Sequence, residues 1–137
     1  MILNISEAAN LAIHALTYLA QHPAEQPVTT GVVARTLGAS EAHLNKVLQR
    51  LKKAGLVNSM RGPGGGFSLR KNPEDINLKE IYEIIDGPLR QHVCMLGHSE
   101  CEFGQCIFGD LLTNVHEQVD SHFSRTTLAS FIESSAG

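Results

Sequence analysis

Residues 40 to 67 read Ser40-Glu-Ala-His-Leu-Asn-Lys-Val-Leu-Gln-Arg50-Leu-Lys-Lys-Ala-Gly55-Leu-Val-Asn-Ser-Met-Arg61-Gly-Pro-Gly-Gly-Gly-Phe67. The first half predicts a helix that Ser40 caps, because Leu44, Val47, Leu48 and Leu51 recur at helical spacing. Gly55 suits the left-handed residue that closes such a helix. The second half predicts two strands, 56–60 and 67–69, joined by a tip of Gly and Pro with Arg61 at its base. A helix followed by such a hairpin is the central part of a winged helix.

The residues before this stretch complete a helix-turn-helix. Thr29 or Thr30 can cap a short helix that Gly38 ends, and the turn to Ser40 is short and contains Gly, as the motif requires. A helix over 5–21, capped by Ser6, precedes this pair, and a helix over 77–86 follows the hairpin. Residues 1–86 are therefore predicted to form a winged helix-turn-helix DNA-binding domain.

The remainder of the chain predicts a loop and a long helix. Residues 87–106 have no periodicity, which is uncommon in a compact domain unless the loop is functional or held by a ligand. From Ile107 to Phe123, apolar residues recur about every fourth position, and 128–132 can form a last short turn. The stripe is longer than a small winged domain needs, so a second copy of the chain is its natural partner. The expected fold is mainly α with a small β-hairpin wing, and residues 107–137 form a dimerisation helix with a C-terminal turn.

Charge is divided along the chain. The net charge is −3, yet residues 35–71 hold eight cations and one acid, and residues 72–137 hold eleven acids and three cations. A compact region of +7 in an acidic chain is typical of a surface that binds a polyanion such as double-stranded DNA. No leader-like or membrane-spanning run is seen, which favours a cytoplasmic protein with no membrane partner. The sequence contains neither a nucleophile–base set nor a phosphate-binding loop, so it does not predict an enzyme.

Candidate DNA contacts lie on the exposed face of the second helix of the motif and on the wing. Asn45 and Gln49 could pair with adenine, and His43 or Lys46 with guanine, while more distal cations hold phosphates. Arg61 is the candidate for the minor groove, since a Gly-rich tip lets the backbone approach the DNA closely. The predicted DNA-binding residues are Ser40, His43, Asn45, Lys46, Gln49, Arg50, Arg61 and Gly64.

All three cysteines lie in the loop 87–106, at Cys94, Cys101 and Cys106. An odd count in a polar loop argues against a disulfide framework and for ligation or redox chemistry. Thiolates suit iron–sulfur clusters, zinc and copper(I), but the closely spaced pairs of structural zinc sites are missing. His92 and His98 flank the first cysteine and could complete a site. Free thiols that form a disulfide directly are the alternative.

The chain resembles the bacterial regulators of the IscR and NsrR type. The resemblance is carried by the wing, by Ser40-Glu-Ala-His-Leu44, by Ile84-Ile-Asp-Gly87, and by the three-cysteine loop before a long helix. It implies a homodimeric transcription factor with a 2Fe–2S or 4Fe–4S iron–sulfur cluster on Cys94, Cys101 and Cys106. Relatives add a fourth ligand, either a His where this chain has Gly109 or an acid of the partner subunit where it has Asn10. A cofactor-free, thiol-based redox-sensing regulator is the other hypothesis.

Overall fold

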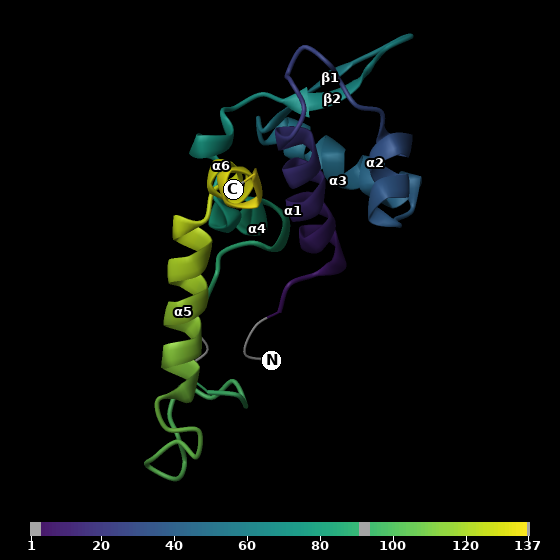
Figure 1. Cartoon of the computed structure of the whole chain (residues 1–137). Helices are drawn as coiled ribbons and strands as arrows, with labels where there is room; N and C mark the ends of the chain where they lie inside the picture. Colours follow the sequence, from purple (N-terminus) through teal and green to yellow (C-terminus); the bar gives the residue numbers. More distant parts are fainter. Residues whose placement is uncertain (1–3, 91–93, 137) are drawn as a thin grey trace.

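The computed structural model describes residues 4–90 and 94–136 and confirms a mainly helical fold with one small hairpin. Its body contains α1, α2, α3 and the strands β1 and β2, followed by a short 3-10 helix η1 and by α4 (Figure 1). The loop that holds the cysteines then leads to α5 and α6. The bounds are α1 Glu7–Ala20, α2 Thr30–Leu37, α3 Glu41–Lys53, β1 Val57–Met60, β2 Gly66–Leu69, η1 Pro73–Asp75, α4 Leu78–Asp86, α5 Leu111–Arg125 and α6 Leu128–Ala136.

Local signals in the sequence set the ends of the first three helices. Ser6, Thr29 and Ser40 each accept a hydrogen bond from a backbone amide in the first turn, at 3.0, 3.3 and 3.3 Å respectively. These side chains satisfy amides that have no partner within the helix. Gly38 ends α2 with a φ of 66°, the left-handed conformation that glycine adopts without steric cost. The predicted helix-turn-helix is thereby confirmed.

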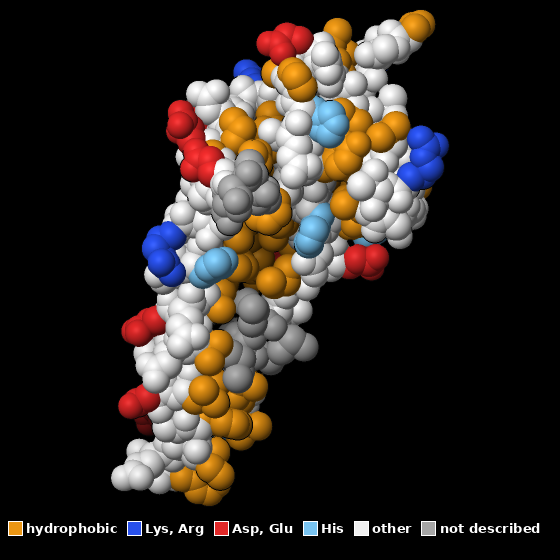
Figure 2. All heavy atoms as spheres, viewed as in Figure 1, with side chains coloured by type: hydrophobic (Ala, Val, Ile, Leu, Met, Phe, Trp, Pro, Cys, Tyr) orange, Lys and Arg blue, Asp and Glu red, His pale blue; other side chains and the backbone are white. Residues whose placement is uncertain are grey.

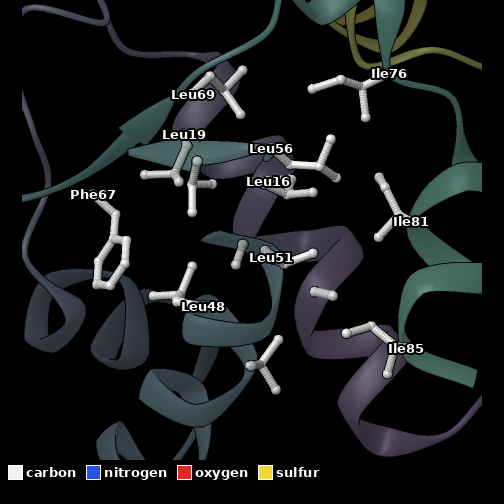
Figure 3. Packing of buried hydrophobic residues seen from close by; sticks show 14 of the residues in the cluster. Leu16, Leu19, Leu48, Leu51, Leu56, Phe67, Leu69, Ile76, Ile81 and Ile85 are labelled. Atoms are coloured by element: carbon white, nitrogen blue, oxygen red, sulfur yellow. The ribbon is translucent and has the colours of Figure 1, made fainter. Parts of the chain in front are cut away.

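The core is built around α1, which packs against α2, α3, α4, α6 and β2. Ala9, Ala12, Ala15 and Leu16 on this helix have no exposed surface. Figure 3 shows Leu16 close to Leu51 of α3 and Leu56, with Ile81 and Ile85 of α4 on the neighbouring side. The helix-turn-helix and α4 therefore share one hydrophobic core.

The wing is an antiparallel pair of strands in which Val57 lies opposite Leu69 and Met60 opposite Gly66. Residue Val28, before α2, adds a bridge to β2 that the sequence did not predict. Its amide and carbonyl each form a 2.8 Å hydrogen bond with the backbone of Phe67. The wing is thus attached to the loop between α1 and α2 as well as to its own hairpin.

Two predictions for the C-terminal part are wrong in detail. Ile107 is not in the long helix, which begins only at Leu111, and its side chain is 95% exposed. The reason is a turn in which the Gly109 amide donates to the Cys106 carbonyl at 2.9 Å, with Gly109 at a φ of 57° that a right-handed helix excludes. The expected short turn over 128–132 is instead the nine-residue helix α6, which packs against η1 and α1.

The helix α5 extends away from the body, and its far end carries the cysteine loop, opposite the wing (Figure 1). Leu128, at the start of α6, is buried and its amide donates to the Ile76 carbonyl at 3.0 Å. This bond returns the chain to the body after α5. Among the described residues, no helix combines the length and apolar character needed to cross a bilayer.

We predict that Gly66→Ala destabilises the protein more than Gly64→Ala. Both glycines have positive φ, at 146° and 76°, but a Cβ at Gly66 would lie 2.3 Å from the Val28 carbonyl oxygen, whereas Gly64 has open space around it. The free energy of unfolding should fall by about 1–2 kcal/mol for Gly64→Ala and by about 1–3 kcal/mol more for Gly66→Ala. Urea unfolding followed by circular dichroism measures both. Equal losses in the free energy of unfolding for the two variants would contradict the close approach of the Val28 carbonyl to Gly66.

Candidate functional site

The outward face of α3 presents most of the predicted DNA contacts together. Asn45, Lys46 and Gln49 are exposed, and His43 is half-buried, while Leu44, Val47, Leu48 and Leu51 on the other face are in the core. The Ser40 hydroxyl is the helix cap and accepts from the His43 amide, so it fixes the first turn of this face. The described structure therefore gathers these side chains on one surface, as predicted.

Residues 61–65 form the tip of the wing between β1 and β2, and Arg61 and Gly64 in this tip are exposed. Figure 1 shows the hairpin extending from the body. The Gly65 amide donates to the Gly62 carbonyl at 2.9 Å, and a Cβ at Gly65 would lie 2.3 Å from the Met60 carbonyl oxygen. The tip is consequently narrow and has almost no side chains besides Arg61 and Pro63. Such a tip allows backbone to come close to a sugar-phosphate surface.

Two cations of the basic segment, Lys71 and Arg50, have partners within the protein. Lys71 forms an ion pair with Glu80 of α4, with 3.0 Å between Nζ and Oε1. Arg50 in α3 is exposed overall, but its Nη2 donates to the carbonyls of Ile84 and Ile85 at 3.3 and 2.9 Å. No local pattern predicts this contact, because Ile84 and Ile85 are more than thirty residues away from Arg50 in the chain.

Each cysteine begins the same kind of turn. The carbonyls of Cys94, Cys101 and Cys106 accept hydrogen bonds from the amides of Gly97, Gly104 and Gly109 at 3.0, 3.2 and 2.9 Å. The three glycines have φ values of 80°, 77° and 57°. The loop is therefore built from three Cys-x-x-Gly turns. The repeat is present in the sequence, but reasoning from the cysteine spacing alone missed it.

The sulfur atoms have different surroundings. Cys94 is half-buried, and hydrogen bonds from the backbone of His98, and then of Leu96 and Gly97, lower the pKa of its thiol. Cys101 is exposed and its thiol donates to the Gln105 carbonyl at 3.4 Å. Within residues 4–90 and 94–136, no three His, Cys, Asp or Glu side chains converge as a metal-binding set.

The other candidate ligands lie apart or outside the described residues. His98 is exposed, and His92 lies outside the residues that the structure describes. Asn10 is exposed on α1, where it lines a shallow pocket with Glu7, Leu11, His14 and Leu37. Its backbone carbonyl accepts from Nδ1 of His14 at 2.7 Å. The amide oxygen is therefore accessible from outside this chain.

Large apolar side chains gather around the cysteines. Figure 2 shows hydrophobic atoms along α5 and over the loop at its far end. The exposed fractions reach 76% for Leu96, 87% for Phe103 and 95% for Ile107. Exposed apolar groups in such number on one region are typical of a surface that another molecule covers. The set comprises Met95, Leu96, Phe103, Ile107, Phe108 and Leu111.

Comparison with known proteins gives a consistent result. A family profile described as Rrf2, iron-dependent transcriptional regulator, matches residues 5–134. The HTH-type transcriptional regulator IscR of Serratia proteamaculans is 28% identical over 131 residues, which cover 95% of this chain and 79% of that protein.

Two solved structures are similar over nearly the whole chain. The structure of CymR, the global cysteine regulator of B. subtilis, matches with a TM-score of 0.79 and 28% identity, covering 94% of this chain and 95% of that one. The structure of T. potens IscR matches with a TM-score of 0.74 and 28% identity, covering 97% and 88%.

We predict that Asp120→Asn weakens the attachment of α5, because the Lys79 Nζ lies 2.7 Å from Asp120 Oδ1 and joins α4 to α5. This hydrogen bond lowers the pKa of Asp120 and raises that of Lys79. The stabilisation that ionised Asp120 adds to the free energy of unfolding is therefore present above about pH 4. It is lost as the pH falls through the lowered pKa of Asp120. The Lys79 contribution is lost as the pH rises through its raised pKa, above about pH 10.5.

The melting temperature of Asp120→Asn should accordingly fall below that of the parent at neutral pH, and the two should converge in acid. Glu117→Gln, on an exposed position of the same helix, is the control and should behave as the parent does. Since the pair is partly exposed, 1 M salt should reduce the difference. A difference that persists unchanged in acid would contradict the ion pair.

Proposed function

The chain belongs to the Rrf2 family of transcriptional regulators, and we propose that an iron–sulfur cluster held by Cys94, Cys101 and Cys106 controls its affinity for an operator. It is a DNA-binding regulator and not an enzyme. The observation that carries the proposal is the repeat of three Cys-x-x-Gly turns in one exposed loop. Three thiols, each at the start of the same kind of turn in one loop, are candidate donors that a bound cluster would have to draw together, whereas packing cysteines would be buried.

The donor chemistry fits a cluster. Cys94 receives backbone N–H hydrogen bonds that favour its thiolate, the form that ligates iron. The loop around the sulfurs is rich in apolar groups, which limits access of water once another surface covers them. A bound cluster would supply a centre sensitive to nitric oxide, oxygen or the supply of clusters. Cys94, Cys101 and Cys106 would hold it as thiolates.

A fourth ligand comes, in this proposal, from Asn10 of the partner subunit. Gly109 has no side chain to donate and closes the third cysteine turn instead. The Asn10 side chain is exposed on α1 and so is accessible to a second chain. An amide oxygen is a weaker ligand for iron than thiolate, which makes this corner of the site the most labile.

The operator contacts are proposed for the outward face of α3 and for the wing. The first turns of a recognition helix read base edges in the major groove, and the wing reaches the neighbouring minor groove. Arg61 at the narrow tip would enter that groove, and the backbone at Gly64 would approach the phosphates. The residues proposed for α3 are Ser40, His43, Asn45, Lys46 and Gln49.

A homodimer is proposed to assemble along α5. Leu111 is 48% exposed, Val115 is half-buried, and the apolar surface around them continues over the cysteine loop (Figure 2). Two copies would then present two recognition helices to an operator with two-fold symmetry. Binding at the cysteines alters operator affinity only if it favours one arrangement of the two copies over another. Since the relatives are regulators of bacteria, whose DNA lies in the cytoplasm, we propose that the protein acts there.

A cofactor-free regulator is the second candidate. Its support is the likeness to CymR, described as a global cysteine regulator, together with three free thiols of which one has a lowered pKa. In this version, oxidation of the cysteines, or exchange with a small disulfide that leaves a mixed disulfide on the protein and releases one thiol, would change operator affinity directly.

Anaerobic reconstitution separates the two candidates. Protein supplied with iron and sulfide should develop visible charge-transfer absorption, with iron and acid-labile sulfide bound in stoichiometric amounts. Cys101→Ala should remove most of this absorption, whereas Ser99→Ala in the same loop should keep it. Stable protein without iron or sulfide, whose operator affinity changes with thiol oxidation, would favour the second candidate.

Arg61→Ala should weaken operator binding about tenfold and reduce the slope of log K against log salt by about 0.9, because one phosphate-region cation is lost. Arg70 directly follows β2, away from the tip of the wing. Arg70→Ala removes the same charge and should have a smaller effect on affinity and on the salt slope. Fluorescence anisotropy at several salt concentrations measures both. Equal effects of the two substitutions would argue against a specific role for the wing tip.

A further inference from the structure

We propose that Arg50 is a positioning residue, which ties the recognition helix to the point where the cysteine loop leaves the body. The sequence predicted a DNA contact for this side chain. The inference rests on the proposed function in one respect, because it takes the cysteine loop as the part that controls DNA binding.

Arg50 contacts the C-terminal end of α4, where backbone carbonyls lack hydrogen-bond donors within the helix. Arg50 lies in the last turn of α3, and its Nη2 donates to the carbonyls of Ile85 at 2.9 Å and of Ile84 at 3.3 Å. Both carbonyls belong to the last turn of α4, where the carbonyls have no partner within the helix and carry the negative end of its dipole. A guanidinium is always charged and suits this position. The bonds therefore hold two helix ends together.

The same helix end also fixes the start of the cysteine loop. Gly87 donates its amide to the Glu83 carbonyl at 3.0 Å, and Leu89 donates its amide to Glu83 Oε2 at 2.9 Å. These two bonds set the direction in which residues 87–89 leave α4. A displacement of the loop therefore acts on the last turn of α4, which Arg50 touches.

A further pair of bonds joins this point to α1. The Asp86 carboxylate accepts from the Ser6 amide at 3.0 Å and from the Ser6 hydroxyl. Ser6 is also the cap of α1, the helix that carries Asn10. The last turn of α4 is thus bonded to α1, to the loop and, through Arg50, to the recognition helix. Of these links, the one through Arg50 reaches the DNA-binding surface directly.

A positioning role and a phosphate contact differ in their dependence on salt. A cation that neutralises a phosphate releases a counterion, and its removal lowers the salt slope by about 0.9. A cation bonded within the protein releases none, so its removal weakens binding without changing the slope. Arg50→Met keeps much of the side-chain length and removes all donors. Lys46→Met, on the exposed face of the same helix, is the matched control.

The experiment measures affinity for an operator selected from random-sequence DNA, at several concentrations of KCl. Arg50→Met should lower the affinity about tenfold, as expected for the loss of charge-assisted hydrogen bonds, with the slope of the parent. Lys46→Met should lower the slope. A slope that falls by about 0.9 in Arg50→Met would assign Arg50 to the DNA and overturn the inference.

Amide exchange without DNA gives an independent readout. Arg50→Met should accelerate exchange of the Gly87 and Leu89 amides about tenfold or more, while Lys46→Met leaves them unchanged. Unchanged exchange in Arg50→Met, or an equal acceleration throughout α1 and α3, would overturn the positioning role. If the parent binds no selected operator, the proposed function fails, and the exchange experiment still decides the role of Arg50.

Discussion

The absence of side-chain bulk on one face of α1 is the constraint on which the other elements depend. Ala9, Ala12 and Ala15 are fully buried and extend only a methyl group each. Helices can therefore approach α1 closely from two sides, α3 from one and α4 from the other. Since the core is packed at high density, the positions of these two helices relative to each other follow from their common contact with α1.

This arrangement separates the two candidate sites, with one hydrophobic core between them. The wing and α3 belong to the body, and the cysteine loop lies at the far end of α5 (Figure 1). The regular elements between them are held by apolar packing and by a few polar links such as Lys79–Asp120 and Ser6–Asp86. Regulation by the cysteines, as proposed, would thus move whole helices and not single side chains.

Local features were predictable from the sequence, and contacts between distant segments were not. The caps at Ser6 and Ser40 depend on neighbours within one turn, so residue type and periodicity sufficed for the fold class and for which side of α3 is exposed. The bridge from Val28 to Phe67 and the bonds of Arg50 join residues more than thirty positions apart and leave no local pattern. The predicted start of the long helix at Ile107 was wrong, because the prediction relied on the spacing of apolar residues and gave no weight to Gly109. For the cysteines, the sequence identified three candidate donors but not the Cys-x-x-Gly turns that hold them.

The cysteine turns have a consequence for how such loops can be recognised. The repeating unit of the loop is the four-residue turn, since each hydrogen bond joins the carbonyl of a cysteine to the amide of the glycine in the same Cys-x-x-Gly sequence. The segments between units differ in length, with His98-Ser-Glu100 after the first turn and Gln105 alone after the second. Insertions or deletions there would leave every turn intact while changing the interval between sulfurs. Distant relatives should therefore be aligned on their glycines, and a shift in cysteine interval alone is no reason to assign a chain to a different chemistry.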